Sequence, residues 1–330
     1  MVLVFINIRG VKMKIVALER ASYGEDIDLS MFNDFGEFDM YDFSTPEEMQ
    51  DRAKDAEAII INKMPINVKT IGNLPKLKLV LEAATGYDNV DIEYCKSRGI
   101  EVRNAKGYST DSVVMHTFAS FFYVCEKLKY YDEYVKNGDY CNSPTFVHYG
   151  PSFYELKGKT WGIVGLGNIG KGVAKVAESF GCKVVYFSTS GKNNDDHYTR
   201  VELDELLKES DIISIHAPLN DVTRDMFNAE AFNKMKKSAI LVNVGRGPIV
   251  NDGDLVNALN NGVIAGAALD VLSKEPMLED NPLLAIKDSN KLIVTPHIAW
   301  ASVEARCRLM DEVYKNIQSY LEGGNYNLLN

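Results

Sequence analysis

Three side chains that could carry out acid–base chemistry each follow a short apolar run. An Asn-Val-Gly-Arg sequence ends at Arg246, Glu275 precedes a proline, and His297 completes a Thr-Pro-His sequence. If the three apolar runs are parallel strands of an open α/β sheet, their carboxyl ends lie at one edge, where such sheets bind ligands. We therefore expect a cation, a carboxylate and an imidazole in one crevice.

The types of these residues indicate one reaction class. Histidine titrates near neutrality, so we predict that His297 is a general acid and base. A carboxylate beside the ring fixes its tautomer and favours its protonated form, a role that we assign to Glu275. A guanidinium can bind a carboxylate and an adjacent carbonyl together, which we assign to Arg246. The set predicts reversible reduction of a small 2-oxo acid by hydride transfer.

A GxGxxG turn indicates what supplies the hydride. It lies directly after an apolar run ending at Val164 and directly before a helical pattern. In this context the first glycine permits a tight turn, the second admits a pyrophosphate, and the third lets helix and strand pack closely. The helix start then holds the anion. The residues predicted to bind the dinucleotide here are Gly165, Gly167, Asn168, Ile169 and Gly170.

The next strand, near 183–187, ends without the acidic residue that usually binds the ribose hydroxyls of NAD. Ser188, Thr189 and Lys192 stand there instead, and they could serve either the 2′-hydroxyl of NAD or the 2′-phosphate of NADP. Both cofactors therefore stay open. We expect the ends of later strands to complete the cofactor crevice through His216, Ala217, Pro218, Val244 and Asp270.

The pattern along the chain is that of an α/β protein with doubly wound parallel sheets. One series of strands is expected near 13–18, 57–62, 78–83 and 100–104, with helices near 46–54 and 88–98. A long helix is predicted over 110–134, followed by an aromatic-rich loop over 138–158. Six further strands are predicted near 160–164, 183–187, 212–216, 239–244, 264–270 and 291–295. An amphipathic helix over 301–321 ends the chain, and residues 1–12 are interpreted as a non-structural extension.

Composition limits the partners. The 330 residues suit two domains, and 36 Lys and Arg against 46 Asp and Glu give a net charge of −10. With no basic run, we expect neither nucleic-acid nor membrane binding. Five widely spaced cysteines without a CxxC pair favour a reduced cytoplasm, and we expect no metal.

With these motifs in order and at suitable spacing, the chain resembles the D-specific 2-hydroxyacid dehydrogenase family. The resemblance implies that Arg246, Glu275 and His297 are the catalytic set. It also implies a Rossmann NAD(P)-binding domain over 110–300, inserted in a split, flavodoxin-like substrate domain over 1–109 and 301–330, and a homodimer.

Within that family, the segments around Thr85-Gly86 and Trp300 are most similar to the glycerate dehydrogenase, or hydroxypyruvate reductase, branch. The similarity implies that the backbone amides of Thr85 and Gly86 hold the substrate carboxylate and that Trp300 lies near the pocket. Hydroxypyruvate and glyoxylate are then the expected substrates, with D-glycerate and glycolate as products. The alternatives are a D-lactate-type or bulkier 2-oxo acid reductase and a dinucleotide-sensing, corepressor-like binding protein.

Overall fold

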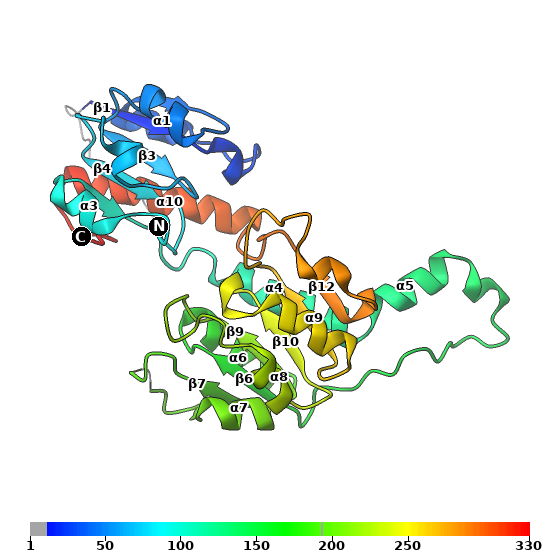
Figure 1. Cartoon of the computed structure of the whole chain (residues 1–330). Coiled ribbons are helices and arrows are strands. Elements are labelled where there is room, and N and C mark those ends of the chain that lie inside the picture. Colours follow the sequence, from blue (N-terminus) through cyan, green and yellow to red (C-terminus); the bar gives the residue numbers. More distant parts are fainter. Residues whose placement is uncertain (1–11, 193) are drawn as a thin grey trace. The chain divides into compact units, whose positions relative to one another are not determined.

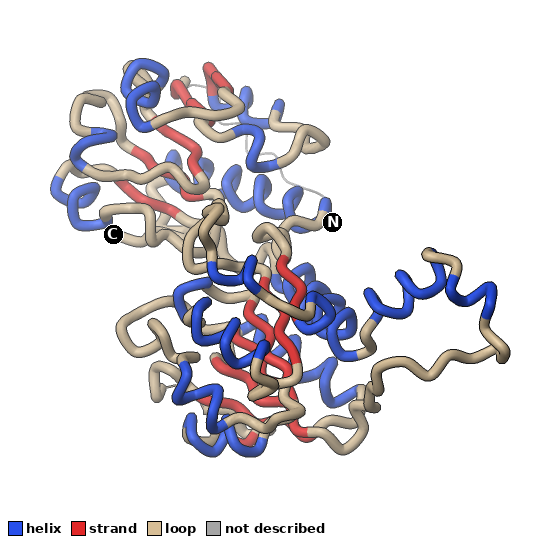
Figure 2. The backbone as a smooth tube through the Cα atoms, turned by 45° about the vertical axis from the view of Figure 1, so that its right-hand side comes forward, coloured by secondary structure: helices blue, strands red, loops and turns tan. Residues whose placement is uncertain are grey.

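The computed structural model describes residues 12–192 and 194–330, which form two compact units (Figure 1). Unit 1 combines the segment through Ser109 with Ser302–Asn330, and unit 2 is Thr110–Ala301. Each unit has a parallel sheet between helices (Figure 2). The expected fold class, two doubly wound parallel-sheet α/β domains, is confirmed.

Unit 1 is built on five parallel strands in the order β2-β1-β3-β4-β5, which is the flavodoxin-like order. The strands are β1 (Met13–Ala17), β2 (Gly36–Met40), β3 (Ala58–Ile61), β4 (Leu79–Glu82) and β5 (Glu101–Arg103). The helices are α1 (Pro46–Arg52), α2 (Val68–Ile71), α3 (Ile92–Ser97) and α10 (Val303–Leu321), with short 3-10 helices at Arg20–Tyr23 and Ser30–Phe35. Strands β3 and β4 are buried along their whole length, as central strands of a parallel sheet should be.

The last helix of the chain belongs to unit 1, where Figure 1 shows α10 in red beside the cyan strands. Ser302 caps it, and Leu309, Val313 and Ile317 form its buried face, which packs against β4. The fully buried Arg103 at the end of β5 donates to the carbonyl oxygens of Asn316 and Tyr326. Helices α1, α2 and α3 enclose a second apolar core with the strands.

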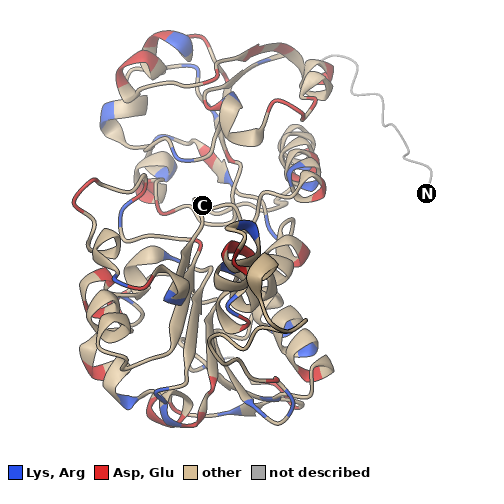
Figure 3. Cartoon of the chain, turned by 90° about the vertical axis from the view of Figure 1, so that its right-hand side faces the viewer, with Lys and Arg blue, Asp and Glu red and all other residues tan. Residues whose placement is uncertain are grey.

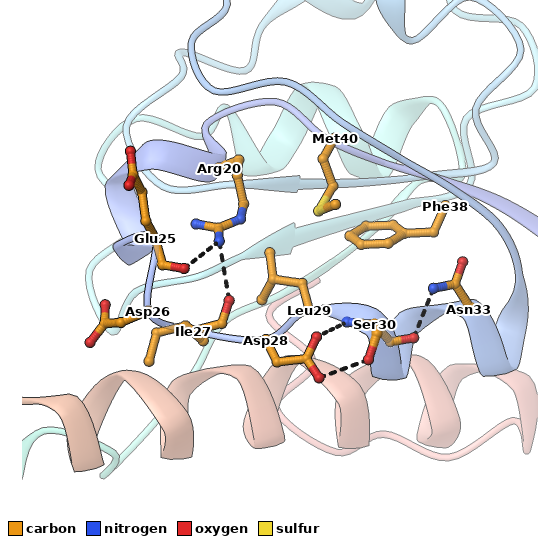
Figure 4. A pocket seen from close by; sticks show the side chains of 10 residues that line it. All are labelled: Arg20, Glu25, Asp26, Ile27, Asp28, Leu29, Ser30, Asn33, Phe38 and Met40. Carbon is orange, nitrogen blue, oxygen red and sulfur yellow. Dashed lines mark hydrogen bonds between the residues drawn. The ribbon is translucent and has the colours of Figure 1, made fainter.

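A surface hollow of about 440 Å³ lies at the β1–β2 connection of unit 1 (Figure 4). The Arg20 guanidinium there donates to the backbone carbonyls of Glu25 and Ile27, and Asp28 accepts from the hydroxyl of Ser30. These polar groups thus bond to one another and hold the connecting loop in place.

Unit 2 has seven parallel strands in the order β12-β11-β10-β9-β6-β7-β8. They are β6 (Thr160–Val164), β7 (Lys183–Phe187), β8 (Thr199–Arg200), β9 (Ile212–Ile215), β10 (Ile240–Asn243), β11 (Gly266–Leu269) and β12 (Leu292–Val294). The helices are α4 (Thr110–Cys125), α5 (Leu128–Lys136), α6 (Asn168–Ser179), α7 (Leu203–Glu209), α8 (Ala229–Lys234) and α9 (Asp252–Asn260). Short 3-10 helices occupy Asp139–Asn142, Gly247–Ile249, Pro282–Ala285 and Ser289–Lys291.

The two faces of this sheet carry separate apolar cores. One includes Phe118 of α4 and Val173 of α6, and the other includes Leu206, Phe232 and Leu255 of α7, α8 and α9. Charged residues lie mainly on the outer helices and loops, whereas the strands between them are almost free of charge (Figure 3). The chain runs outward from β6 to β8 and returns to β9 on the other side of β6. The sheet therefore has its topological switch point between β6 and β9.

Three predictions of local structure were wrong. Strands β2 and β8 were not predicted, because both are edge strands and lack the apolar run of a buried strand. Strand β8 is only two exposed residues long, and β2 has no fully buried residue. The helix predicted over 110–134 is two helices, since Lys127 adopts a left-handed conformation with φ 59°. Helix α4 packs against α6, β10 and β11, whereas α5 buries no residue at all. Residues 1–11 of the predicted extension lie outside the described residues.

Candidate active site

The glycine turn follows β6 and opens α6, as its spacing predicts. Gly165 has φ 92°, a left-handed conformation that favours glycine. A Cβ atom at Gly170 would overlap the carbonyl of Gly165, whereas a Cβ atom at Gly167 would meet nothing within 4 Å. The helix thus packs closely on the strand while open space remains at the Gly167 backbone. Because the first N–H groups of the 12-residue α6 have no intrahelical acceptor, this space fits a diphosphate.

Three strand ends meet beside the turn. A Cβ atom on Gly165 would lie 3.0 Å from the backbone nitrogen and Cα of Ala217, and one on Gly245 would lie 3.1 Å from the Ala217 carbonyl oxygen. The structure therefore places Ala217, after β9, between the ends of β6 and β10. Val244 beside it is half-buried, and Pro218 is exposed. These residues line the edge on which the glycine turn opens.

His216 is held as a neutral imidazole. Trp161 Nε1 donates to Ser214 Oγ at 2.8 Å, and Ser214 Oγ lies 2.9 Å from His216 Nε2. Because the indole can only donate, the serine hydroxyl can donate onward to Nε2, which leaves the ring proton on the buried Nδ1. Burial lowers the pKa of His216 to about 3. His216 is therefore unsuited to proton transfer near neutrality.

The turn after β7 contains the residues predicted for the ribose side. Ser188 is buried, Thr189 is half-buried, and Lys192 is exposed. The backbone N–H of Gly191 donates to the Ser188 carbonyl at 3.1 Å, which closes a tight turn. Among the described residues, the buried Ser188 hydroxyl has no hydrogen-bond partner.

His297 and Glu275, predicted to act together in proton transfer, lie within hydrogen-bond distance of each other. His297 Nδ1 lies 2.7 Å from Glu275 Oε2, and the other oxygen of Glu275 accepts from the backbone N–H of Leu272 at 2.9 Å. The pair is partly accessible, with 24% of the His297 side chain and 33% of the Glu275 side chain exposed. A carboxylate at Nδ1 fixes the tautomer, so the proton that comes and goes is the one on Nε2.

Asp270 holds the loop that carries His297. Its buried carboxylate accepts from the backbone N–H groups of Ile298 at 2.9 Å and Ala299 at 2.8 Å, and from the hydroxyl of Thr295 at 2.6 Å. Its carbonyl accepts from the N–H of His297 at 2.8 Å. These bonds support the positive φ of 57° at His297, which is uncommon for a residue other than glycine. Asp270, predicted from the sequence as a cofactor contact, thus anchors the histidine loop.

Two supporting residues were missed by sequence reasoning. His116 Nε2 lies 3.0 Å from the Thr295 hydroxyl, although His116 is on α4, far away in the sequence. Asp252, at the start of α9, accepts from the hydroxyl of Ser273 and from the side-chain amide of Asn281 at 3.2 Å. It therefore fixes both ends of the loop that carries Glu275. Nothing in the local sequence of either residue signals these contacts.

Arg246 follows β10, the strand next to β11. Asn243 shapes its turn by donating from its side-chain amide to the Arg246 carbonyl at 3.0 Å and by accepting from the N–H of Gly245 at 3.1 Å. Arg246 is half-buried, and its Nη1 donates to the Gly245 carbonyl at 3.0 Å. A Cβ atom at Gly247 would overlap the Leu272 carbonyl, so this turn packs directly against the loop of Glu275.

Trp300, also in unit 2, is half-buried.

In unit 1, Thr85 and Gly86 follow β4 at the carboxyl edge of its sheet. The Thr85 hydroxyl donates to the Ala105 carbonyl at 2.9 Å, and the Asn104 amide donates to the Thr85 carbonyl at 2.7 Å. Buried Glu82 accepts from the side-chain amide of Asn89 at 2.9 Å, which closes the loop on its other side. Burial raises the pKa of Glu82 well above its usual range, so the fold favours the protonated form of this carboxyl group.

The described ranges contain neither a metal-binding cluster nor a membrane-spanning helix. Across residues 12–192 and 194–330, we find no group of three or more His, Cys, Asp or Glu side chains arranged to hold a metal ion. No helix in the same ranges has the length and apolarity needed to cross a membrane.

The chain is similar to known proteins in sequence and in fold. Residues 118–299 match the family model for the NAD-binding domain of D-isomer specific 2-hydroxyacid dehydrogenases. The chain is 38% identical to a glycerate dehydrogenase of Methylorubrum extorquens over 317 residues, which cover 96% of this chain and 98% of that one. It is 37% identical to a hydroxypyruvate reductase of Blautia hydrogenotrophica over 326 residues, which cover 96% and 100%. Its fold is similar to that of an acyclic imino acid reductase in complex with NADPH and D-arginine, with TM-score 0.87, 32% identity and coverage of 96% and 100%.

Proposed function

The chain belongs to the D-isomer specific 2-hydroxyacid dehydrogenase family, and from that membership we propose that it interconverts hydroxypyruvate or glyoxylate with D-glycerate or glycolate. The observation that carries the proposal is the 2.7 Å pair of His297 and Glu275 at the carboxyl edge of the unit 2 sheet. Relatives at 37–38% identity named for these substrates support the choice.

When bound, NAD(P)H supplies the hydride for the carbonyl carbon. His297 gives its Nε2 proton to the oxygen as the carbonyl becomes a hydroxyl, and takes a proton in the reverse direction. Glu275 remains ionised, orients the ring and stabilises the imidazolium. Arg246 binds the substrate carboxylate and polarises the adjacent carbonyl. The predicted roles of Trp300 and of the Thr85 and Gly86 amides in substrate binding stay predictions.

The proposed dinucleotide site is the open edge at Gly167, with Ser188, Thr189, Lys192, His216, Ala217, Pro218, Val244 and Asp270 around it. The N–H groups at the start of α6 would hold the diphosphate. A neutral His216 adds no positive charge to this edge. The overall charge of −10 makes these local backbone dipoles the main source of attraction for the anion.

We also propose a homodimer in which a second copy covers the segment from α5 to about residue 158. Inside this segment His148 stacks on Tyr134 at 3.8 Å and lies 2.9 Å from the Tyr130 hydroxyl, so it is internally ordered. Yet Phe146 is 91% exposed and Tyr149 is 88% exposed. Exposed aromatic side chains that gather on one segment favour a protein interface. Light scattering should give twice the chain mass, and Phe146→Ser with Tyr149→Ser should lower it.

A panel assay tests the activity. Loss of NADH or NADPH absorbance is followed with hydroxypyruvate, glyoxylate, pyruvate and phenylpyruvate, and the chirality of the product is determined by chiral chromatography. Fastest turnover of hydroxypyruvate or glyoxylate, with a D product from hydroxypyruvate, is expected. Faster turnover of pyruvate or phenylpyruvate would favour a D-lactate-type or bulkier-acid reductase. Tight NADH binding without turnover of any of the four acids would favour a dinucleotide sensor.

The predicted cytoplasmic location is compatible with five free thiols.

A further inference from the structure

The end of β7 lacks an acid to bind a ribose diol, and Asp195 does not replace it. Asp195, in the loop that follows, gives one oxygen to Lys171 Nζ at 2.8 Å and the other to the backbone N–H groups of His197 and Tyr198. This pairing lowers the pKa of Asp195 to about 2. Asp195 is thus a charged residue whose two carboxylate oxygens are both hydrogen-bonded, and it joins its loop to α6.

Arg200 occupies the adjacent strand end. In the parallel register of β7 and β8, Tyr186 pairs with Arg200, so Arg200 lies beside β7 two residues before Ser188. The carboxyl ends of β7 and β8 lie on the same edge of the sheet as the glycine turn, because all seven strands are parallel. The structure therefore brings a guanidinium to the turn over 188–191 from a point twelve residues further along the chain.

The Arg200 side chain reaches that turn directly. Its Nη1 donates to the Gly191 carbonyl at 2.9 Å and to Asn194 Oδ1 at 3.2 Å. The same turn contains the buried Ser188 hydroxyl, which has no partner among the described residues, and is followed by the exposed Lys192. The described part of this strand end thus combines two cations with hydroxyl groups.

We propose that Arg200, together with Lys192 and the hydroxyl groups of the 188–191 turn, forms a binding site for the 2′-phosphate of NADPH and makes the enzyme prefer NADPH to NADH. The proposal rests on the proposed dehydrogenase function. A guanidinium presents paired N–H donors that match phosphate oxygens, and charge-assisted hydrogen bonds are about twice as strong as neutral ones. A carboxylate at position 188 would repel the phosphate, and Ser188 removes that repulsion.

The first test measures binding without catalysis. Isothermal titration compares adenosine 2′,5′-bisphosphate with adenosine 5′-monophosphate, which differ by the 2′-phosphate alone. The intact protein should bind the bisphosphate more tightly. Arg200→Gln should weaken bisphosphate binding by about 10-fold to 100-fold, and change binding of the monophosphate by less than about 3-fold. Arg200→Lys keeps the charge but loses the planar guanidinium, so its affinity for the bisphosphate should lie between that of the intact protein and that of Arg200→Gln.

A matched control is Lys183→Gln. Lys183 is an exposed cation on β7, the strand next to that of Arg200, and it lies at the amino end of β7, away from the turn. This variant changes the net charge by the same amount as Arg200→Gln and should leave binding of both nucleotides unchanged. An equal loss with Lys183→Gln would show a general charge effect and would overturn the proposal.

The second test measures kcat/KM for NADPH and NADH with hydroxypyruvate. Arg200→Gln should raise KM for NADPH while leaving kcat/KM for NADH unchanged. Equal losses for both cofactors would show that Arg200 only shapes the turn, and wild-type preference for NADH would also refute the proposal. If no 2-oxo acid is turned over, the proposed function fails, but the titration still decides whether the 2′-phosphate site exists.

Discussion

Glu275 holds the imidazole of His297 by a 2.7 Å hydrogen bond to Nδ1, and its second oxygen is fixed by the backbone of Leu272. The carboxylate is thereby anchored at one end and holds the ring at the other. This arrangement leaves the other nitrogen, Nε2, for the proposed exchange of a proton with substrate.

Replacing Glu275 by Gln should separate orientation from charge. The amide oxygen can still accept from Nδ1, but it no longer stabilises the imidazolium, so kcat should fall by about 10-fold to 1,000-fold. The pH profile of reduction should move to lower pH, because removing a nearby negative charge disfavours the protonated ring. Glu275→Asp, which keeps the charge on a shorter side chain, should retain the wild-type profile. An unchanged profile in Glu275→Gln would contradict the role of the carboxylate.

His297→Ala should abolish most of the activity while dinucleotide binding is retained. Loss of one positioned proton donor costs about 100-fold to 10,000-fold in rate. His197→Ala is the matched control, because His197 is exposed and also pairs with a carboxylate, Glu178, at 2.9 Å. Steady-state rates and fluorescence titration with NADPH measure the two effects. Near-full activity in His297→Ala would refute the assignment.

Arg246→Lys should raise KM for the 2-oxo acid and lower kcat together. A lysine keeps the charge but cannot form two parallel bonds to a carboxylate and its adjacent carbonyl. We expect kcat/KM to fall by about 100-fold, with KM for NADPH nearly unchanged. If only KM for the dinucleotide changed, Arg246 would belong to the cofactor site.

His216 should make unit 2 sensitive to mild acid. Its pKa is about 3 in the fold against 6.5 for an ordinary histidine, so unfolding takes up a proton between these values and stability is lost as pH falls below about 6.5. Between pH 7 and pH 5 the loss is about 2 kcal/mol. His216→Gln keeps an acceptor for Ser214 but does not titrate. The urea concentration at the midpoint of unfolding should therefore fall less between pH 7 and pH 5 in this variant than in the wild type. Equal losses would show that His216 is not responsible.

Glu82 should have the opposite effect on unit 1. Its raised pKa means that the folded protein keeps a proton that the unfolded chain loses, so stability declines as pH rises above about 4.5. Glu82→Gln can still accept from Asn89 and removes this decline. The variant should melt at a higher temperature than the wild type at about pH 8, and the difference should shrink toward pH 5. A lower melting temperature at both pH values would contradict the prediction.

Much of the candidate site could be read from the chain because it is local in sequence. The glycine spacing places Gly165, Gly167 and Gly170 on a strand–helix turn, and the structure shows the open space at Gly167 that this spacing predicts. Likewise, Arg246, Glu275 and His297 each follow a strand made mainly of apolar residues. Since parallel strands end at one edge, their order along the chain was enough to bring Glu275 and His297 together.

The sequence by itself therefore determined the α/β class, the glycine turn between β6 and α6, and the pairing of Glu275 with His297, because each depends on short-range spacing and strand polarity. Only the tertiary structure decided what supports them. Asp270 holds the histidine loop, and His116 reaches the same loop from α4. Asp252 holds the loop of Glu275 from α9, and Arg200 comes to the 188–191 turn from a strand too short to have a pattern. Such contacts join residues far apart in the chain, and they depend on side-chain packing and strand register that residue spacing does not encode.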